Sequence, residues 1–197
     1  MGQKGNVMNE ITRKIAPGVL AASLAIACTP TFSNVYAASS SIRVGSDAPT
    51  ISDAIDMADS GDTIIIPKGV YAEQISVETD GITIKAEKGA ILDGSRIKPK
   101  SGASSMVYIQ ASGITLDNLE IKGLKLKNPS SSITPIGIEV DAGSRDISIS
   151  NCKIHDMGCL YTKDSDEYNA HGILVSAEVD EPIENISIKN ASCISLT

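Results

Sequence analysis

Large aromatic side chains are nearly absent from this sequence. Its 197 residues include no tryptophan, five tyrosines and a single phenylalanine, Phe32. A globular domain of this size normally fills the middle of its core with aromatic rings, because each ring buries a large apolar area. A repetitive coil needs none, because each turn encloses a narrow interior that stacked isoleucine, valine and leucine can fill. The scarcity of rings therefore favours a repetitive architecture.

Basic residues are also few. Lysine and arginine number 17 against 24 aspartate and glutamate. Residues 1–37 contain three of the basic and one of the acidic side chains, so the remaining chain has 14 against 23 and a net charge of −9. Nucleic-acid binding needs clustered lysine and arginine to meet the phosphates. We therefore expect no nucleic-acid partner.

The first 37 residues have the pattern of a secretory signal peptide. Lys4, Arg13 and Lys14 precede an apolar run over 15–28, and the small-residue site "VYA" ends at Ala37. We predict cleavage after this alanine and a protein that is secreted or held at the cell surface.

Two alternatives remain open for this segment. A retained anchor is the first, but the run is shorter than the roughly 20 apolar residues that cross a bilayer, and it contains Pro17. We expect no membrane span after cleavage. The second alternative is lipid attachment to Cys28 in "AIAC", where Ala25 stands at a position that favours leucine in such sites.

The rest of the sequence repeats itself. The stretches "ITLDNLEIKG" (114–123), "ISISNCKIHD" (147–156) and "ISIKNASCIS" (186–195) each begin with two apolar residues two apart and carry an asparagine four residues after the first. A weaker copy, "ITIKA", begins at Ile82, so that successive copies lie 32, 33 and 39 residues apart. Such periods indicate a solenoid.

Short β-branched runs bounded by glycine, asparagine, aspartate or proline predict the strands. They lie at 62–67, 81–86, 105–110, 113–121, 137–142, 146–154, 172–177 and 185–190. One amphipathic helix is predicted over 50–61, with Ser52 as its N-cap and Gly61 at its end, and we expect it to cover the first turn. The expected fold class is all-β, a parallel β-helix (solenoid) over 38–197 with a short N-terminal capping helix.

The recurring asparagines have a structural interpretation. If each copy is one turn, equivalent residues stack about 4.8 Å apart. Asn118, Asn151 and Asn190 would then form an inward-facing ladder at a tight bend, where their amides bond to each other and to the backbone. An amide carries both a donor and an acceptor, which explains asparagine in place of aspartate.

Three cysteines follow the predicted cleavage site: Cys152, Cys159 and Cys193. Their alignment with the other copies of the repeat predicts the environment of two of them. Cys193 aligns with Ile121 and Ile154 of the earlier copies. We expect Cys152 and Cys193 to be small buried apolar side chains rather than parts of a disulfide framework.

Several stretches together suggest a family: "TISDAIDMADSGDTIIIPKGVYAEQISV", "GITIKAEKGAILDGS", "GITLDNLEIKG", "RDISISNCKIHDMG" and "NAHGILV". This arrangement resembles the right-handed parallel β-helix of the pectate-lyase-like superfamily, in particular the N-terminal part of its secreted bacterial members. That superfamily includes polysaccharide lyases, hydrolases, epimerases and surface adhesins, so the resemblance implies a fold and not one activity.

The resemblance places saccharides across the outward side of one sheet. Here that sheet would consist of "MVYIQ", "GIEVDA" and "GILVSA", with Val107, Ile138 and Ile173 pointing inward. The segments 123–136 and 157–171 would enter it as loops, and 177–185 would leave it. The outward columns would be Tyr108, Glu139 and Leu174, and Gln110, Asp141 and Ser176. With His171, the candidate groove residues are Tyr108, Gln110, Glu139, Asp141, His171 and Ser176.

Calcium is the one cofactor that the resemblance suggests, because calcium-dependent lyases hold the ion with clustered carboxylates and use a lysine or arginine as base. Glu139 and Asp141 have neither a third stacked carboxylate nor a basic neighbour in those columns, which favours a solvated strand face. The loop "KDSDEY" offers Asp164, Asp166 and Glu167 as candidate metal ligands, without the spacing of a recognised calcium loop.

The two histidines complete no nucleophilic set at recognisable spacing. His155 is expected to face solvent. His171 precedes "GILV", where it is interpreted either as a general base overhanging the groove or as a turn residue bonded to backbone.

The last copy stops at "CISLT" within an apolar strand, so we expect either the first four to five turns of a longer protein or a truncated reading frame, and a monomer. Two classes of function fit. One is a secreted lyase-like protein that acts on or binds acidic polysaccharide, of which this chain alone would show no cleavage. The other is a non-catalytic surface or adhesion module, which the lack of stacking rings favours.

Overall fold

Parallel strands make up most of the computed structural model, which describes residues 39–97, 104–127, 134–160 and 170–194. A six-stranded sheet has the order β1 (Ser41–Arg43), β2 (Thr63–Ile66), β5 (Thr83–Ala86), β8 (Thr115–Asp117), β12 (Arg145–Ser150) and β16 (Glu184–Lys189). A five-stranded sheet has the order β3 (Gly69–Tyr71), β6 (Ala90–Asp93), β9 (Glu120–Lys122), β13 (Lys153–His155) and β17 (Ser192–Ile194). A four-stranded sheet has the order β4 (Ile75–Val77), β7 (Ser105–Ile109), β11 (Ile136–Val140) and β15 (His171–Val175).

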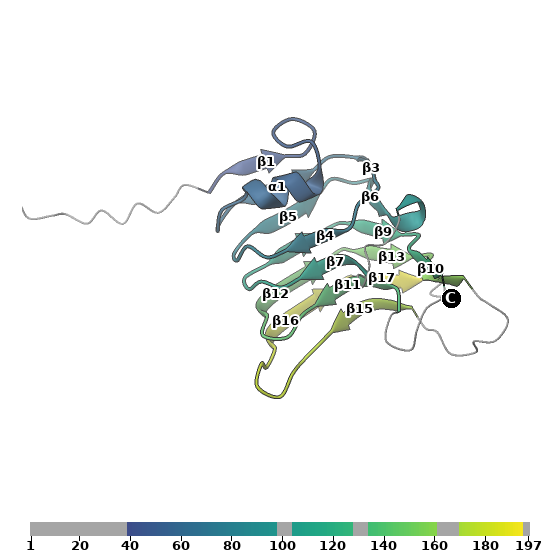
Figure 1. The fold of residues 1–197 in the computed structure, drawn as a ribbon. Helices are drawn as coiled ribbons and strands as arrows, with labels where there is room; N and C mark the ends of the chain where they lie inside the picture. Colours follow the sequence, from purple (N-terminus) through teal and green to yellow (C-terminus); the bar gives the residue numbers. More distant parts are fainter. Residues whose placement is uncertain (1–38, 98–103, 128–133, 161–169, 195–197) are drawn as a thin grey trace, which may run out of the picture. The chain divides into compact units, whose positions relative to one another are not determined.

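Successive strands of the chain enter these sheets in turn, and each new strand pairs with the strand that the preceding turn placed in the same sheet (Figure 1). In the six-stranded sheet, Thr83 pairs with Thr115, Thr115 with Ser148, and Ser148 with Ser187. These partners are 32, 33 and 39 residues apart, which are the intervals of the sequence repeat. One repeat is therefore one turn, and the predicted parallel β-helix is confirmed.

Aliphatic side chains fill the interior of the coil. One column in the six-stranded sheet consists of Ile64, Ile84, Leu116, Ile149 and Ile188. The first four have no exposed surface, whereas Ile188, on the last strand of the sheet, is 45% exposed. Each turn thus buries its apolar residues against the turns on either side, which explains why every copy begins with apolar residues two apart.

Helix α1 (Ile51–Met57) packs against β2 and β4 near the N-terminal end of the coil (Figure 1). Ile51, Ala54 and Ile55 are buried on one face of the helix. This apolar face explains why a single helix precedes the strands, since it covers the first turn, and the predicted capping helix is confirmed.

The ends of the helix differ from the prediction. The N-cap is Thr50, whose Oγ1 accepts a hydrogen bond from the N–H of Asp53 at 3.0 Å. Ser52 is the second residue of the helix, and its backbone N–H and its hydroxyl both donate to the carboxylate of Glu73, at 3.0 and 2.9 Å. The helix ends at Met57, before Gly61, because the backbone is already extended at Ala58.

The three asparagines of the repeat lie at bends between strands, as predicted, but their side chains do not face inward. Asn118, Asn151 and Asn190 have φ angles of 63°, 55° and 52°. Asn118 is half-buried, and the other two are exposed. Left-handed backbone strains most side chains and is tolerated by asparagine, so the bend itself selects this residue.

The amides link neighbouring turns in different ways. Asn190 donates to Oδ1 of Asn151 at 3.3 Å, and Asn151 donates to Oδ1 of Asp117 at 2.7 Å. Asn118 donates to the carbonyl oxygen of Ala86 at 2.9 Å. The ladder is therefore continuous only between the last two copies.

Replacing Asn151 by alanine is expected to lower the free energy of unfolding by about 1–2 kcal/mol, because alanine is strained in the left-handed region and forms no inter-turn hydrogen bond. Asn151→Gly separates the two effects, because glycine relieves the strain without restoring the bond. Urea unfolding should rank wild type above the glycine variant and the alanine variant last. Equal stability of wild type and Asn151→Ala would contradict a structural role.

Two details of the predicted turns need correction. The segments expected to be loops include β10 (Lys125–Lys127) and β14 (Gly158–Leu160), which pair in parallel because equivalent residues stack there too. Cys193 pairs with Ile154, as its register predicted, yet it is exposed because it lies on the last strand of its sheet. Cys152 is buried as expected, and both thiols are free.

Candidate functional site

The four-stranded sheet aligns the predicted groove residues on its outward side. Val107, Ile138 and Ile173 are paired and point inward, as predicted. Tyr108, Glu139 and Leu174 are paired in the same way, one position further along the strands. The backbone ladder continues past the strand ends, so Gln110, Asp141 and Ser176 follow as a second outward column.

Strand β4 extends both columns and was missed by the sequence analysis. Ser76 pairs with Tyr108, and the N–H of Gln110 bonds to the carbonyl oxygen of Val77, which aligns Glu78 with Gln110. The short run "QISV" has the right alternation, but three residues are too few to stand out from a loop. Glu78 adds a third carboxylate to the face, but Gln110 lies between it and Asp141 in the column.

Asp141 is held by two donors from the neighbouring strand. The hydroxyl of Tyr108 donates to Oδ2 of Asp141 at 2.5 Å, and the amide of Gln110 donates to the same oxygen at 3.2 Å. Burial, the hydrogen bond to Asp141 and the charges of Asp141, Glu139 and Glu78 all raise the pKa of Tyr108. The phenol is therefore a neutral donor at neutral pH, and it fixes the carboxylate.

A hollow of about 340 Å³ lies beyond this end of the sheet, between the segments that leave four successive turns. Its lining is formed by Asp80, Gln110, Ala111, Ser112, Ala142, Gly143, Ser144, Arg145, Asp180, Glu181 and Pro182. The segment 177–185, which was predicted to leave the sheet here, contributes the last three. The hollow adjoins the Asp141 column because Gln110 belongs to both.

The charged residues that line the hollow are three carboxylates and one guanidinium. Hydrogen bonds link the segments that form part of its lining. The N–H of Ser112 donates to Oδ1 of Asp80 at 2.7 Å, and the N–H of Arg145 donates to the hydroxyl of Ser112 at 3.1 Å. The guanidinium of Arg145 lies 3.8 Å from Glu184. Arg145 was not found from the sequence because it is the first residue of β12, a strand of the six-stranded sheet, and only the turn of the coil places it in the same hollow as Gln110.

Other candidate residues lie apart from this cluster. His171 begins β15, and the five residues of extended chain to Ser176 separate the two by roughly 16 Å. The proposed calcium ligands Asp164, Asp166 and Glu167 lie outside the described residues. Within residues 39–97, 104–127, 134–160 and 170–194, no three His, Cys, Asp or Glu side chains form a group that could hold a metal ion.

Comparison with known proteins concerns the fold. No protein-family model and no curated protein sequence matches this chain. A pectin methylesterase mutant solved with a hexasaccharide is 18% identical, with a TM-score of 0.41, over 80% of this chain and 55% of that one. A pectin methylesterase from Erwinia chrysanthemi, PemA, is 16% identical, with a TM-score of 0.37, over 76% of this chain and 66% of its own.

The chain thus spans about half the length of the first of these structures, with 55% of it covered. The class of protein is defined by the stacked parallel sheets of the chain itself, which form a parallel β-helix. No helix among the residues that the structure describes is long and apolar enough to cross a membrane.

Proposed function

We propose that this is a secreted protein that binds polysaccharide on the outward face of the four-stranded sheet and in the adjoining hollow. The observation that supports the proposal is the fixed carboxylate of Asp141. Tyr108 and Gln110 hold its Oδ2, while Oδ1 has no hydrogen-bond partner in the described part of the chain. An oriented carboxylate oxygen is a strong acceptor for sugar hydroxyl groups, and Glu139 offers a second on the same face.

The charge of the site determines how an acidic polysaccharide would bind. Glu78, Glu139 and Asp141 lie on the face, and the hollow adds three more carboxylates against the single guanidinium of Arg145. Uronate groups would be repelled by this surface unless a cation lay between them. We therefore propose that acidic polysaccharide binds with calcium as a bridging counter-ion, whereas neutral polysaccharide binds without it.

The columns favour binding over cleavage. Their eight residues, from Ser76 to Ser176, include no lysine or arginine that could remove a proton beside a uronic carboxylate. The second candidate function is a lyase-like activity, and Arg145 at the margin of the face is the observation that favours it. The non-catalytic function agrees with the single aromatic ring, Tyr108, on the face.

The test is binding of the purified chain to polygalacturonate, alginate and a neutral glucan, each with calcium and with a chelator. Asp141→Asn is expected to weaken binding about tenfold or more, because one charge-assisted hydrogen bond contributes about 1.5–3 kcal/mol. Asp56→Asn is the matched control, since Asp56 is exposed on α1 and belongs neither to the two outward columns nor to the lining of the hollow. Binding that is unchanged in Asp141→Asn would overturn the assignment of the site.

Cleavage is measured in the same samples through the absorbance of the unsaturated lyase product. We expect none from wild type. Turnover that disappears in Arg145→Ala would instead establish the lyase function.

A further inference from the structure

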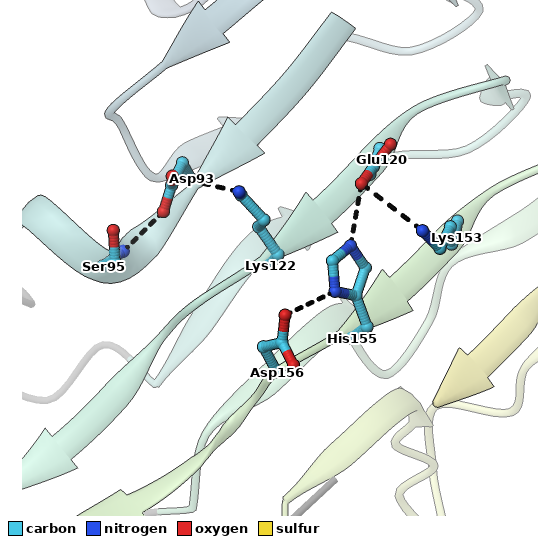
Figure 2. A network of polar contacts seen from close by, with 7 residues as sticks. All are labelled: Asp93, Ser95, Glu120, Lys122, Lys153, His155 and Asp156. Carbon is cyan, nitrogen blue, oxygen red and sulfur yellow. Dashed lines mark hydrogen bonds and ion pairs between the residues drawn. The ribbon is translucent and has the colours of Figure 1, made fainter. Parts of the chain in front are cut away.

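The outward face of the five-stranded sheet carries a polar cluster that the proposed function does not use. Pairing of β9 with β13 places Glu120 beside Lys153 and Lys122 beside His155. Asp156 follows β13 directly. We refer to Glu120, His155 and Asp156 as the histidine cluster, and Figure 2 shows the imidazole between the two carboxylates.

Both ring nitrogens of His155 contact carboxylate oxygens. Nε2 lies 2.8 Å from Oε1 of Glu120, which belongs to the preceding turn, and Nδ1 lies 2.7 Å from Oδ2 of Asp156. An ionised carboxylate only accepts hydrogen bonds, and a neutral imidazole has one N–H to donate. Two hydrogen bonds therefore require a proton on each nitrogen. The sequence predicted a solvent-facing histidine, but only 16% of this side chain is exposed, because Glu120 and Asp156 lie against both edges of the ring.

The surrounding charges suit an imidazolium. Lys122, beside the ring on β9, extends away from it toward Asp93, with Nζ 3.6 Å from Oδ2 (Figure 2). Lys153 lies 3.6 Å from the Glu120 oxygen that His155 also contacts. On the other side, the partner of His155 is Ile194 of β17, which carries no charge. Three carboxylates thus face two ammonium groups, and a protonated His155 balances the set.

Asp156 lies at a bend directly after β13, beside the ring of His155. Its φ angle is 55°, in the left-handed region. The equivalent residue in the preceding turn is Gly123, with a φ angle of 80°. The bend needs a left-handed residue in both turns, but only Asp156 adds a carboxylate, so the two-sided contact is a feature of this turn alone.

We propose that the histidine cluster is a proton-dependent clamp between two successive turns: a doubly protonated His155 bridges Glu120 and Asp156, and loss of one proton breaks one of the two bonds. The clamp stabilises the fold only while the imidazole is charged and both carboxylates are ionised. Its contribution is therefore present while the imidazole is charged and is lost as the pH rises and one ring nitrogen gives up its proton.

The acid limit of the clamp is set by Glu120. The hydrogen bond from His155 lowers the pKa of Glu120, against the opposing effect of burial. A lowered carboxylate pKa means that its stabilising contribution is present above the ordinary glutamate range and is lost as the pH falls through the folded-state value. On the acid side, the clamp is therefore expected to be lost as Glu120 takes up a proton.

The test compares thermal unfolding at about pH 5.5 and about pH 8 at constant ionic strength. Relative to His155→Gln, wild type is expected to gain about 2–4 °C in Tm on acidification, a shift that corresponds to about 1 kcal/mol in a chain of this length. The chain has only two histidines, and the exposed His171 provides the matched control: His171→Gln should behave as wild type. The same pH dependence in wild type and His155→Gln would overturn the proposal.

A second variant and a direct measurement test the clamp even if His155→Gln does not fold. Asp156→Asn keeps a residue that tolerates the left-handed bend but removes one carboxylate, so it should lose most of the extra pH dependence. In wild type, ¹⁵N chemical shifts of His155 at about pH 6 should report protons on both ring nitrogens. A single neutral tautomer in the folded protein at that pH would contradict the clamp.

Discussion

Replacing Ile149 by alanine is expected to lower the free energy of unfolding by about 2–5 kcal/mol. Ile149 has no exposed surface and lies in the inward column between Leu116 of the preceding turn and Ile188 of the following one. Alanine would leave a cavity that parallel strands on both sides cannot collapse to fill, since their spacing is fixed by the backbone ladder. Urea unfolding followed by circular dichroism measures the loss as a shift in midpoint at constant slope.

The matched control is Ile188→Ala, one turn further along the same column. Ile188 is 45% exposed, so its truncation removes less buried area and opens no closed cavity. We expect a loss of about 1 kcal/mol or less. If both variants lose the same stability, the interior column does not determine the stability of the coil.

The second large effect is expected from Gly137→Ala in β11. A Cβ atom at this buried position would lie 2.5 Å from the carbonyl oxygen of Gly172 and 2.6 Å from Cγ2 of Ile154. The first of these is backbone, held by the pairing of β11 with β15, and Ile154 is fully buried. Neither atom can withdraw without moving a strand, so we expect a loss of about 1–3 kcal/mol.

Gly69→Ala in β3 is the comparison for that variant. There the nearest atoms belong to the ring of Tyr71 at 3.4 Å, an ordinary contact with a side chain. Its stability should stay within about 1 kcal/mol of wild type, because glycine in a strand interior contributes little packing. A Gly137→Ala protein as stable as Gly69→Ala would show that β11 and β15 are not held at the spacing described.

The sequence predicted the parts of the fold that depend on local pattern. Apolar residues two apart specify inward columns, and an asparagine after them specifies the bend, so the register of Ile149 and Asn151 followed from the repeat alone. The exposure of Asn151 and Asn190 did not follow from the repeat, because spacing carries no information on φ or on the side of the bend to which the amide points.

Residues from different turns were harder to predict. Tyr108, Gln110 and Asp141 were found because all three lie on strands with clear alternation. Glu78 was missed because it follows a three-residue strand, and Arg145 was missed because it begins a strand of another sheet. His155 was taken as a solvent-facing residue, since no local pattern reveals that Glu120, 35 residues earlier, lies within 2.8 Å of its ring.

The stacking of each turn on the one before has a consequence for how the chain acquires its structure. Successive partners in the six-stranded sheet are 22, 20, 32, 33 and 39 residues apart, and the pairings between the named strands are parallel. A turn therefore forms few stabilising contacts until all of its residues are available. Such distant partners make spontaneous nucleation slow, whereas addition to an existing turn requires closing only one further loop. Because α1 and the first strands come earliest in the sequence, a chain that emerges amino end first presents a template on which every later turn is laid down in order of synthesis.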